Sequence, residues 1–256
     1  MKFELDSCQF EAGGRCLLDA SNLFFEQGTT YGLIGHNGSG KSTLLKLLAR
    51  QQPASRGDIY LNGRAVKSWG NREFARNVAY LPQHLPGTAG LTARELVALG
   101  RFPWQGLLER ATKQDKAEVQ RALEWTDTAR FADRMVDTLS GGERQRIWLA
   151  MLLAQGSRFL LLDEPLSALD IAHQVDMLSL VRRLCRELGV GVIIALHDVN
   201  MVSRYCDELV ALRDGCLLAQ GKPNELMDAT TLEAIYGIRM NVMAHPTDQH
   251  PVAIVE

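Results

Sequence analysis

The spacing of hydrophobic residues divides the chain into strand-like and helix-like stretches. In residues 2–10, Phe3 and Leu5 alternate with polar neighbours, which is the pattern of a half-buried β-strand. Other short apolar runs, bounded by turn residues, predict strands at 29–35, 57–63 and 78–83. Between them, four leucines recur with nearly helical spacing, which predicts a helix from Lys41 towards Pro53.

Strand signals disappear between about residues 88 and 155. Thr92 and Glu95 have the spacing of a capping box, in which each side chain satisfies a free backbone N–H of the other residue. Residues 142–156 have the composition of a further helix. One face of a helix near residue 120 is apolar and consists of Val119, Ala122 and Leu123. The middle of the chain is therefore predicted to be helical.

Strands resume after this helical stretch. Residues 158–165 and 190–198 are almost continuously hydrophobic, as in strands that are buried on both faces, and a helix is predicted between them. Asp214 and Gly215 favour the two-residue turn of a hairpin. A short helix is expected at residues 230–237.

This order of elements predicts one α/β chain with two lobes. Residues 1–85 and 156–256 are expected to form an α/β core lobe, and residues 86–155 a helical lobe. The helical lobe is thus an insertion in the core, and it begins close to Gln83.

Composition narrows the classes of function. The chain has 256 residues, a net charge of −2, and no broad basic character that would favour nucleic acid as a partner. Its apolar runs are shorter than the roughly 20 residues that span a bilayer, and its N-terminus lacks the apolar stretch of a secretory signal. The five cysteines form no CxxC pair, so we expect reduced thiols.

The segment "GHNGSGKS", residues 35–42, is the first that carries chemistry. It fits the phosphate-binding pattern G-x-x-x-x-G-K-[ST] and lies between a predicted strand and a predicted helix. Lys41 should reach the β- and γ-phosphates, and the Ser42 hydroxyl should bind Mg²⁺. The imidazole of His36 is expected to fill the loop rather than bind a ligand. The nucleotide-contacting set is Gly35, His36, Asn37, Gly38, Ser39, Gly40, Lys41, Ser42 and Thr43.

Two acidic residues end the buried run "FLLLDE". Asp163 is expected to hold Mg²⁺, directly or through water, and Glu164 to act as the base that orients the attacking water. An Asp-Glu pair after a strand can also merely cap a helix. Its combination with the phosphate loop favours the role in hydrolysis.

Six segments in order, "GHNGSGKST", "LPQ", "LSGGERQR", "LLLDEP", "SALD" and "ALHD", resemble the nucleotide-binding subunits of ATP-binding cassette (ABC) transporters. The resemblance covers essentially the whole chain, and the LSGG element separates this family from kinases and GTPases. It implies a single ABC ATPase domain over residues 1–256. That fold is a P-loop NTPase (RecA-like) core with an N-terminal antiparallel β subdomain and an inserted α-helical subdomain.

The resemblance also implies a homodimer that binds two ATP molecules between its subunits. Ser140, Gly141 and Gly142 of one subunit would face the γ-phosphate bound by Lys41 of the other. A helix N-terminus with free backbone N–H groups is suited to an anion. The alternative is that Ser140 only caps a helix.

Three further roles follow from the same likeness. Gln83 matches the glutamine that binds Mg²⁺ or water where the helical lobe begins, and Asp170 matches a residue that touches the partner subunit. His197 matches the switch histidine, which contacts the γ-phosphate and helps to hold Glu164. The sequence departs from the family near the adenine site, where Phe10 and Arg15 are the stacking candidates and neither has the usual spacing.

Within the family, segments such as "GRFPWQG" and "ALDIAHQVDMLSLV" resemble importers of iron-siderophores, haem and vitamin B12, above all the ferric-hydroxamate branch. This likeness implies a multi-span permease, a periplasmic substrate-binding protein, and a peripheral position on the cytoplasmic face of a bacterial inner membrane. A soluble ABC ATPase that acts on nucleic acid is the alternative. Apolar residues at the start of the helical lobe would form the permease-docking groove or simply lobe core; they are Leu85, Pro86, Phe102 and Trp104.

Overall fold

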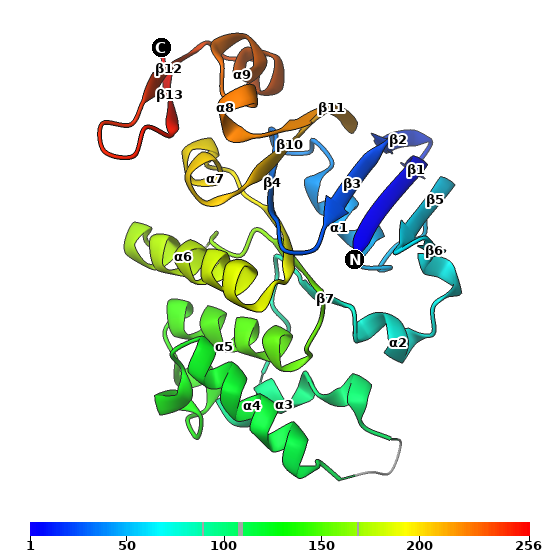
Figure 1. The fold of residues 1–256 in the computed structure, drawn as a ribbon, viewed down its shortest axis with the longest axis vertical. Helices are drawn as coiled ribbons and strands as arrows, with labels where there is room; N and C mark the ends of the chain where they lie inside the picture. Colours follow the sequence, from blue (N-terminus) through cyan, green and yellow to red (C-terminus); the bar gives the residue numbers. More distant parts are fainter. Residues whose placement is uncertain (89, 107–109, 168) are drawn as a thin grey trace.

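In the part of the chain that the structure describes, an eleven-stranded curved sheet carries helices on its faces, and a separate group of helices lies at one end of the molecule (Figure 1). The computed structural model describes residues 1–88, 90–106, 110–167 and 169–256. The strands are β1 (Lys2–Ala12), β2 (Arg15–Ala20), β3 (Leu23–Glu26), β4 (Thr30–Ile34), β5 (Arg56–Leu61), β6 (Arg64–Ala65), β7 (Val78–Leu81), β8 (Phe159–Asp163), β9 (Gly191–Ala195), β10 (Glu208–Arg213), β11 (Cys216–Gly221), β12 (Met240–Ala244) and β13 (Pro251–Val255). The α-helices are α1 (Lys41–Leu48), α2 (Asn71–Ala75), α3 (Ala93–Leu99), α4 (Lys113–Trp125), α5 (Gly141–Ala154), α6 (Ile171–Leu188), α7 (Val199–Tyr205), α8 (Pro223–Leu226) and α9 (Ala229–Tyr236).

The N-terminal strands form the antiparallel part of the sheet. Strand β1 pairs antiparallel with β2, β3 and β5. Phe3 and Leu5 are buried while their neighbours Glu4 and Asp6 are exposed, as the alternation predicts. The register shifts after Asp6, where Ser7 has a positive φ of 49°. The predicted N-terminal antiparallel subdomain is therefore present.

The parallel part of the sheet has the order β10-β4-β9-β8-β7. All residues of β8 and β9 are buried, which explains their continuous hydrophobic runs. Leu161 and Ile193 face the leucines of α1, whereas Leu162 and Ile194 belong to the core under α6 and α7. Both faces of the parallel strands are thus covered by helices.

Helix α1 begins at Lys41 as predicted, but it ends at Leu48, before Pro53. Arg50 has a positive φ of 57°, which breaks the right-handed helical path. The predicted C-terminal bound was therefore wrong, because a turn ends the helix before the proline is reached.

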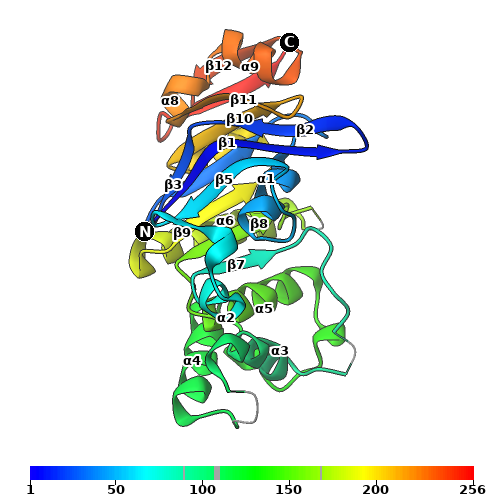
Figure 2. The same ribbon diagram turned by 90° about the vertical axis from the view of Figure 1, so that its right-hand side faces the viewer.

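The residues between β7 and β8 contain the helices α3, α4 and α5, which contact one another (Figures 1 and 2). The predicted capping box of Thr92 and Glu95 is present, and Thr112 and Ser140 begin α4 and α5 with the same arrangement. Within the described residues of this part, strand pairing is limited to one isolated bridge between Thr92 and Met135. The segment between β7 and β8 is therefore helical, as predicted.

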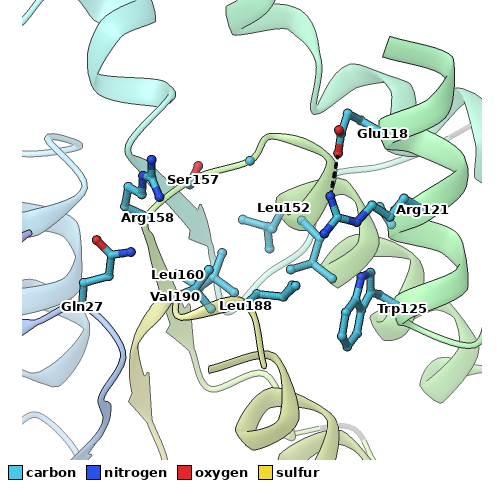
Figure 3. A pocket seen from close by; sticks show the side chains of 13 residues that line it. Gln27, Glu118, Arg121, Trp125, Leu152, Ser157, Arg158, Leu160, Leu188 and Val190 are labelled. Atoms are coloured by element: carbon cyan, nitrogen blue, oxygen red, sulfur yellow. Dashed lines mark ion pairs between the residues drawn. The ribbon is translucent and has the colours of Figure 1, made fainter. Parts of the chain in front are cut away.

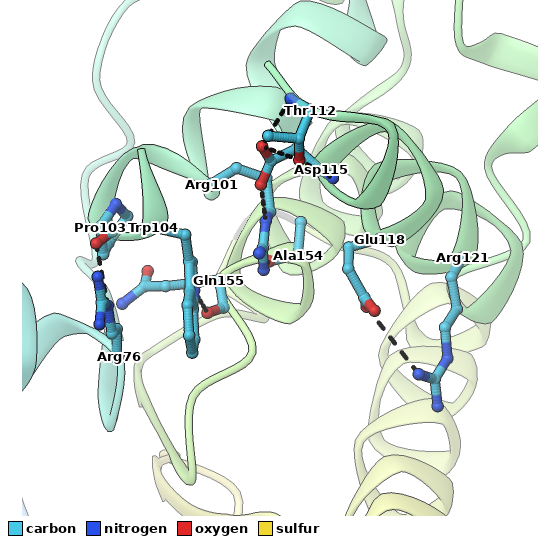
Figure 4. Close-up of polar contacts among 10 residues, drawn as sticks. All are labelled: Arg76, Arg101, Pro103, Trp104, Thr112, Asp115, Glu118, Arg121, Ala154 and Gln155. Carbon is cyan, nitrogen blue, oxygen red and sulfur yellow. Dashed lines mark hydrogen bonds and ion pairs between the residues drawn. The ribbon is translucent and has the colours of Figure 1, made fainter. Parts of the chain in front are cut away.

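A buried ion pair joins the helices of this part (Figure 4). Arg101 Nε donates to Asp115 Oδ1 at 2.9 Å, and each side chain is 7% exposed. Arg101 also donates to the backbone oxygen of Ala154 at 2.8 Å. Burial works against the charged form of Asp115, but hydrogen bonds from Thr112 and Arg101 outweigh it and lower the pKa of this carboxyl group. The pair therefore holds the first turn of α4 against the end of α5.

Replacing Arg101 by methionine should lower the free energy of unfolding by about 3–5 kcal/mol, because the Asp115 carboxylate would stay buried without its cation. Urea denaturation followed by circular dichroism measures the effect. Arg121→Met is the matched control, since Arg121 pairs with Glu118 at 3.9 Å and these side chains are 59% and 36% exposed, against 7% for the buried pair (Figure 4). That control should change stability by less than about 0.5 kcal/mol. Equal losses for both variants would contradict the role of the buried pair.

The C-terminal hairpin of β12 and β13 was not predicted from the sequence. Its two strands pair only with each other, and the hairpin packs on α7. Asn200 fixes this contact, since its side chain donates to the oxygen of Ala253 at 3.0 Å and accepts from the nitrogen of Ala253 at 2.7 Å. The predicted hairpin of β10 and β11 is confirmed, with Asp214 and Gly215 in its turn.

Among the described residues, no helix combines the length and the apolar character that crossing a membrane requires. All five cysteines are free thiols, as expected. Ala89 of the lobe-entrance segment and Ala168 of the SALD segment lie outside the described residues.

Candidate functional site

The phosphate loop connects β4 to α1. Gly40 precedes the helix with a φ of 103°, and Gly35 follows the strand with a φ of 145°. A Cβ atom at Gly35 would lie 2.1 Å from the backbone oxygen of Leu212, so a side chain has no room there. The loop therefore needs glycine to turn its backbone tightly over the start of α1, where free N–H groups favour an anion.

Lys41 lies inside this loop. Its side chain is buried, and Nζ donates to the backbone oxygens of Gly35 at 2.7 Å and His36 at 3.1 Å. Burial lowers the pKa of Lys41, while the negative charges of Glu164 and Asp163 act in the opposite direction. Within the described parts of the chain, no carboxylate forms an ion pair with this ammonium group. It is thus a buried cation whose hydrogen-bond partners are neutral carbonyls, and an anionic ligand would compensate its positive charge.

Ser42 and Asp163 meet at the carboxyl end of β8. The Ser42 hydroxyl donates to Asp163 Oδ1 at 2.8 Å, and the Tyr80 hydroxyl donates to Asp163 Oδ2 at 3.2 Å. Burial raises the pKa of Asp163, and the hydrogen bonds from Ser42 and Tyr80 oppose this rise. A hydroxyl and a carboxylate are the hard oxygen donors that Mg²⁺ prefers, so these two residues fit the ion. Tyr80 was not singled out from the sequence, because its position inside an apolar strand marked it only as a packing residue.

Glu164 lies between Gln83 and His197. Gln83 Nε2 donates to Glu164 Oε2 at 2.6 Å, and His197 Nε2 lies 2.8 Å from Glu164 Oε1. The Glu164 side chain is 11% exposed, and its backbone has a φ of 47°, a left-handed conformation that non-glycine residues seldom adopt. The structure therefore brings these three residues together, although they are separated by 81 and 33 positions in the sequence.

A cavity of about 100 Å³ adjoins this group. It is lined by Glu164, Ser167, Gln174, Leu196, His197 and Met201, among others. Its volume holds a few water molecules, whose share of liquid volume is about 30 Å³ each. A water molecule beside Glu164 therefore has both space and a hydrogen-bond acceptor.

Ser140 begins α5 and is exposed. Its hydroxyl accepts a hydrogen bond from the nitrogen of Glu143 and donates to Glu143 Oε2 at 2.9 Å, so within one chain it caps the helix. Gly142 lies under the ring of His173, where a Cβ atom would come within 2.6 Å of Cδ2. Gly141 is exposed beside Ser140. Helix α5 and helix α1 belong to different parts of the molecule (Figure 1), so one chain does not assemble Ser140 and Lys41 into one site.

Comparison with known proteins shows which family the chain belongs to. Residues 18–167 match the ABC transporter family. The chain belongs to the ABC transporter family. The chain is 42% identical to the ferric enterobactin transport ATP-binding protein of Escherichia coli (strain K12), over 92% of this chain and 88% of that protein. It is 38% identical to the iron(3+)-hydroxamate import ATP-binding protein of Bacillus subtilis (strain 168), over 94% and 90% of the two chains.

Solved structures of ABC proteins share the fold. A chain of an inward-facing ABC transporter, described as of the metal-chelate type, superposes with a TM-score of 0.85 at 24% identity and covers 99% of this chain and 98% of that one. A dimeric bacterial ABC transporter cassette superposes with a TM-score of 0.74 at 25% identity, over 86% and 98%. The predicted P-loop ABC ATPase fold is confirmed.

The ABC cassette places Asp170 at the start of α6. Its carboxylate accepts hydrogen bonds from the nitrogen of His173 at 2.9 Å and from His173 Nδ1 at 2.8 Å, and these bonds lower the pKa of Asp170. His173 thus lies between Asp170 and Gly142, a position that the sequence did not reveal. Asp170 and Gly142 are thereby linked through one imidazole ring.

Of the candidates for stacking on adenine in the ABC cassette, Phe10 packs against the core of the antiparallel strands and Arg15 is exposed at the start of β2. Leu17, on the same strand, is 40% exposed, and its backbone oxygen would lie 3.2 Å from a Cβ atom at Gly40. Stacking by Phe10 or Arg15 stays a prediction.

The aromatic residues at the start of the helical lobe lie on its surface. Phe102 is 65% exposed and Trp104 is 42% exposed, whereas Leu85 packs against the lobe core. The guanidinium group of Arg76 lies 4.7 Å from the Trp104 ring centre, and Trp104 Nε1 donates to the oxygen of Gln155 (Figure 4). Exposed, held aromatic side chains are typical of a surface that binds another protein.

A second cavity, of about 190 Å³, lies between α4 and the start of β8 (Figure 3). Arg158 and Leu160 line it from the start of β8, and Arg121 and Trp125 line it from α4. Asp163 ends β8, so this cavity is at the edge of the sheet opposite the phosphate loop. It therefore does not belong to the nucleotide site.

Proposed function

We propose that this chain is the ATP-hydrolysing subunit of a bacterial importer for iron(III)-siderophore complexes. The observation that carries the proposal is the position of Glu164, held between Gln83 and His197 beside the phosphate loop. The relatives that transport ferric enterobactin and import iron(3+)-hydroxamate support the class of cargo.

Each residue of the site has a separate role in ATP hydrolysis. Lys41 and the loop from Gly35 to Thr43 hold the β- and γ-phosphates of ATP. Ser42, Asp163 and Gln83 would hold Mg²⁺, which supplies positive charge to the phosphate oxygens when bound. Glu164 accepts a proton from the attacking water, and His197 keeps the carboxylate in place.

Two copies of the chain complete each site. Ser140, Gly141 and Gly142 lie exposed or just beneath the surface at the start of α5, far from their own phosphate loop, so in our proposal they serve the ATP of the partner subunit. Asp170 lies at the same interface. A symmetric pair then holds two ATP molecules between its subunits.

Mixing two inactive variants should restore hydrolysis if the sites are shared. Lys41→Ala removes the phosphate contact, and Ser140→Arg blocks the opposite half of the site. In a random mixture half of the dimers contain both variants, and each has one intact site, so about one quarter of the wild-type rate is expected. Thr112→Arg is the matched control, because Thr112 begins α4 with the same kind of capping box. The Thr112→Arg variant should hydrolyse ATP like the wild type. A mixture as inactive as its components contradicts shared sites.

The permease of this importer binds at the exposed Phe102 and Trp104, which keeps the subunit at the cytoplasmic face of the inner membrane. A periplasmic substrate-binding protein delivers cargo to the permease and does not contact this chain. No nucleic acid takes part.

Within the siderophore class we propose a ferric hydroxamate as the cargo. A strain that lacks this chain should fail to grow when ferrichrome is the sole iron source and should recover with the wild-type chain but not with Glu164→Gln. Growth on ferrichrome without the chain, together with loss of growth on enterobactin or haem as the iron source, or loss of growth that requires vitamin B12, would assign a different cargo. Co-purification with nucleic acid instead of a membrane protein would favour a soluble ABC ATPase.

A further inference from the structure

The turn of the C-terminal hairpin gathers two imidazoles and a carboxylate. His245 Nδ1 lies 2.8 Å from Asp248 Oδ1, and His250 Nδ1 lies 2.5 Å from the same oxygen. The three ligand atoms lie within 4.8 Å of one another. In the part of the chain that the structure describes, this is the one such group of three histidine, cysteine or acidic side chains.

The backbone fixes the spacing of these donors. The nitrogen of His245 donates to the oxygen of His250 at 2.9 Å, and the nitrogen of Gln249 donates to the oxygen of His245 at 3.0 Å. The hairpin itself is anchored on α7, where the Ser203 hydroxyl donates to the oxygen of Pro251 at 2.9 Å. The three side chains therefore project from a closed turn on a fixed hairpin, which reduces the entropy lost when they bind a ligand together.

The donor set identifies the class of ligand. Imidazole nitrogen together with carboxylate oxygen suits Zn²⁺, Co²⁺, Ni²⁺ and Fe²⁺, whereas Mg²⁺ and Ca²⁺ prefer oxygen alone. Nitrogen and oxygen donors bind Zn²⁺ at about 2.0–2.2 Å, so donors on one ion lie within about 4.4 Å of each other. The three donor atoms lie within 4.8 Å of one another, slightly beyond this limit, so the side chains must rotate to bind one ion together.

Two features of the turn bear on how an ion would enter. The rings of His245 and His250 stack with centres 4.6 Å apart, so they must turn for both Nδ1 lone pairs to converge on one ion. Arg204 Nε lies 3.8 Å from Asp248 Oδ2, which leaves Oδ1 directed at the imidazoles. A contact of this kind to the second carboxylate oxygen orients a metal ligand.

We propose that His245, Asp248 and His250 bind one divalent transition-metal ion of the zinc class, with water in the remaining positions. The site lies on the C-terminal hairpin and does not depend on the proposed ATPase function. Its three ligands come from a stretch of only six residues, so it forms within one subunit.

The test is a titration of the metal-free, full-length chain with Zn²⁺ in excess Mg²⁺, followed by calorimetry. We expect one more Zn²⁺ per wild-type chain than for the double variant His245→Ala/His250→Ala. Asp248→Asn, which keeps the size of the side chain but removes its charge, should weaken binding by at least about ten-fold. His84→Ala is the control, since His84 is an exposed histidine outside the cluster and should leave binding unchanged.

Co²⁺ gives a second readout. Its visible absorption reports coordination by the protein, and we expect bands with the wild type that are absent from the double variant. Circular dichroism and ATP binding without metal show whether each variant is folded. Equal Zn²⁺ stoichiometry and affinity for the wild type and a folded double variant, or identical Co²⁺ spectra, would overturn the proposal.

Discussion

Glu164→Gln should lower the rate of ATP hydrolysis by about 10²–10⁴-fold while leaving ATP binding intact. A glutamine side chain keeps the size and one oxygen of Glu164, but its amide cannot accept the proton of the attacking water. The change also replaces one of the two oxygens that contact Gln83 and His197 by an NH₂ group. The variant should therefore bind ATP and accumulate as a closed dimer.

Single-turnover hydrolysis measures the chemical step directly, and size-exclusion chromatography with ATP and Mg²⁺ measures the dimer. Glu187→Gln is the matched control, because it makes the same chemical change at a residue that is exposed at the end of α6, away from the site. Hydrolysis by Glu164→Gln within two-fold of the wild-type rate would show that another group is the base.

Lys41→Ala should weaken ATP binding by at least about 30-fold. The loss of a buried charged contact costs about 2–5 kcal/mol, and each 1.4 kcal/mol is a factor of ten in affinity. Lys41 is buried, and its Nζ donates to the backbone oxygens of Gly35 and His36 inside the loop. Equilibrium binding of a fluorescent ATP analogue measures the change.

Lys116→Ala is the control for the loss of a lysine, since Lys116 is exposed on α4. This variant should bind ATP like the wild type. Circular dichroism should show that Lys41→Ala is folded. A folded Lys41→Ala variant with wild-type affinity would contradict the assignment of the phosphate loop.

Local patterns gave much of the fold because they depend on residues that are close together in the sequence. The run from β4 through Gly35 to Lys41 specified a strand, a tight turn and a helix start, and all three are present. The buried runs β8 and β9 were recognisable because both faces of a parallel sheet are covered. The bound of α1 was missed, because a positive φ at Arg50 is not marked by glycine or proline.

By itself, the sequence determined the α/β order, the helical insertion and the residue types that suit a nucleotide, since periodicity and motif spacing are local properties. Tertiary structure decided which of those residues meet. Parallel alignment of β7 and β8 brings the Tyr80 hydroxyl to Asp163, and the same edge of the sheet brings Gln83 to Glu164. It also decided that β12 and β13 pair and that their turn gathers His245 and His250. Such contacts depend on strand order and on packing against α7, which no local pattern records.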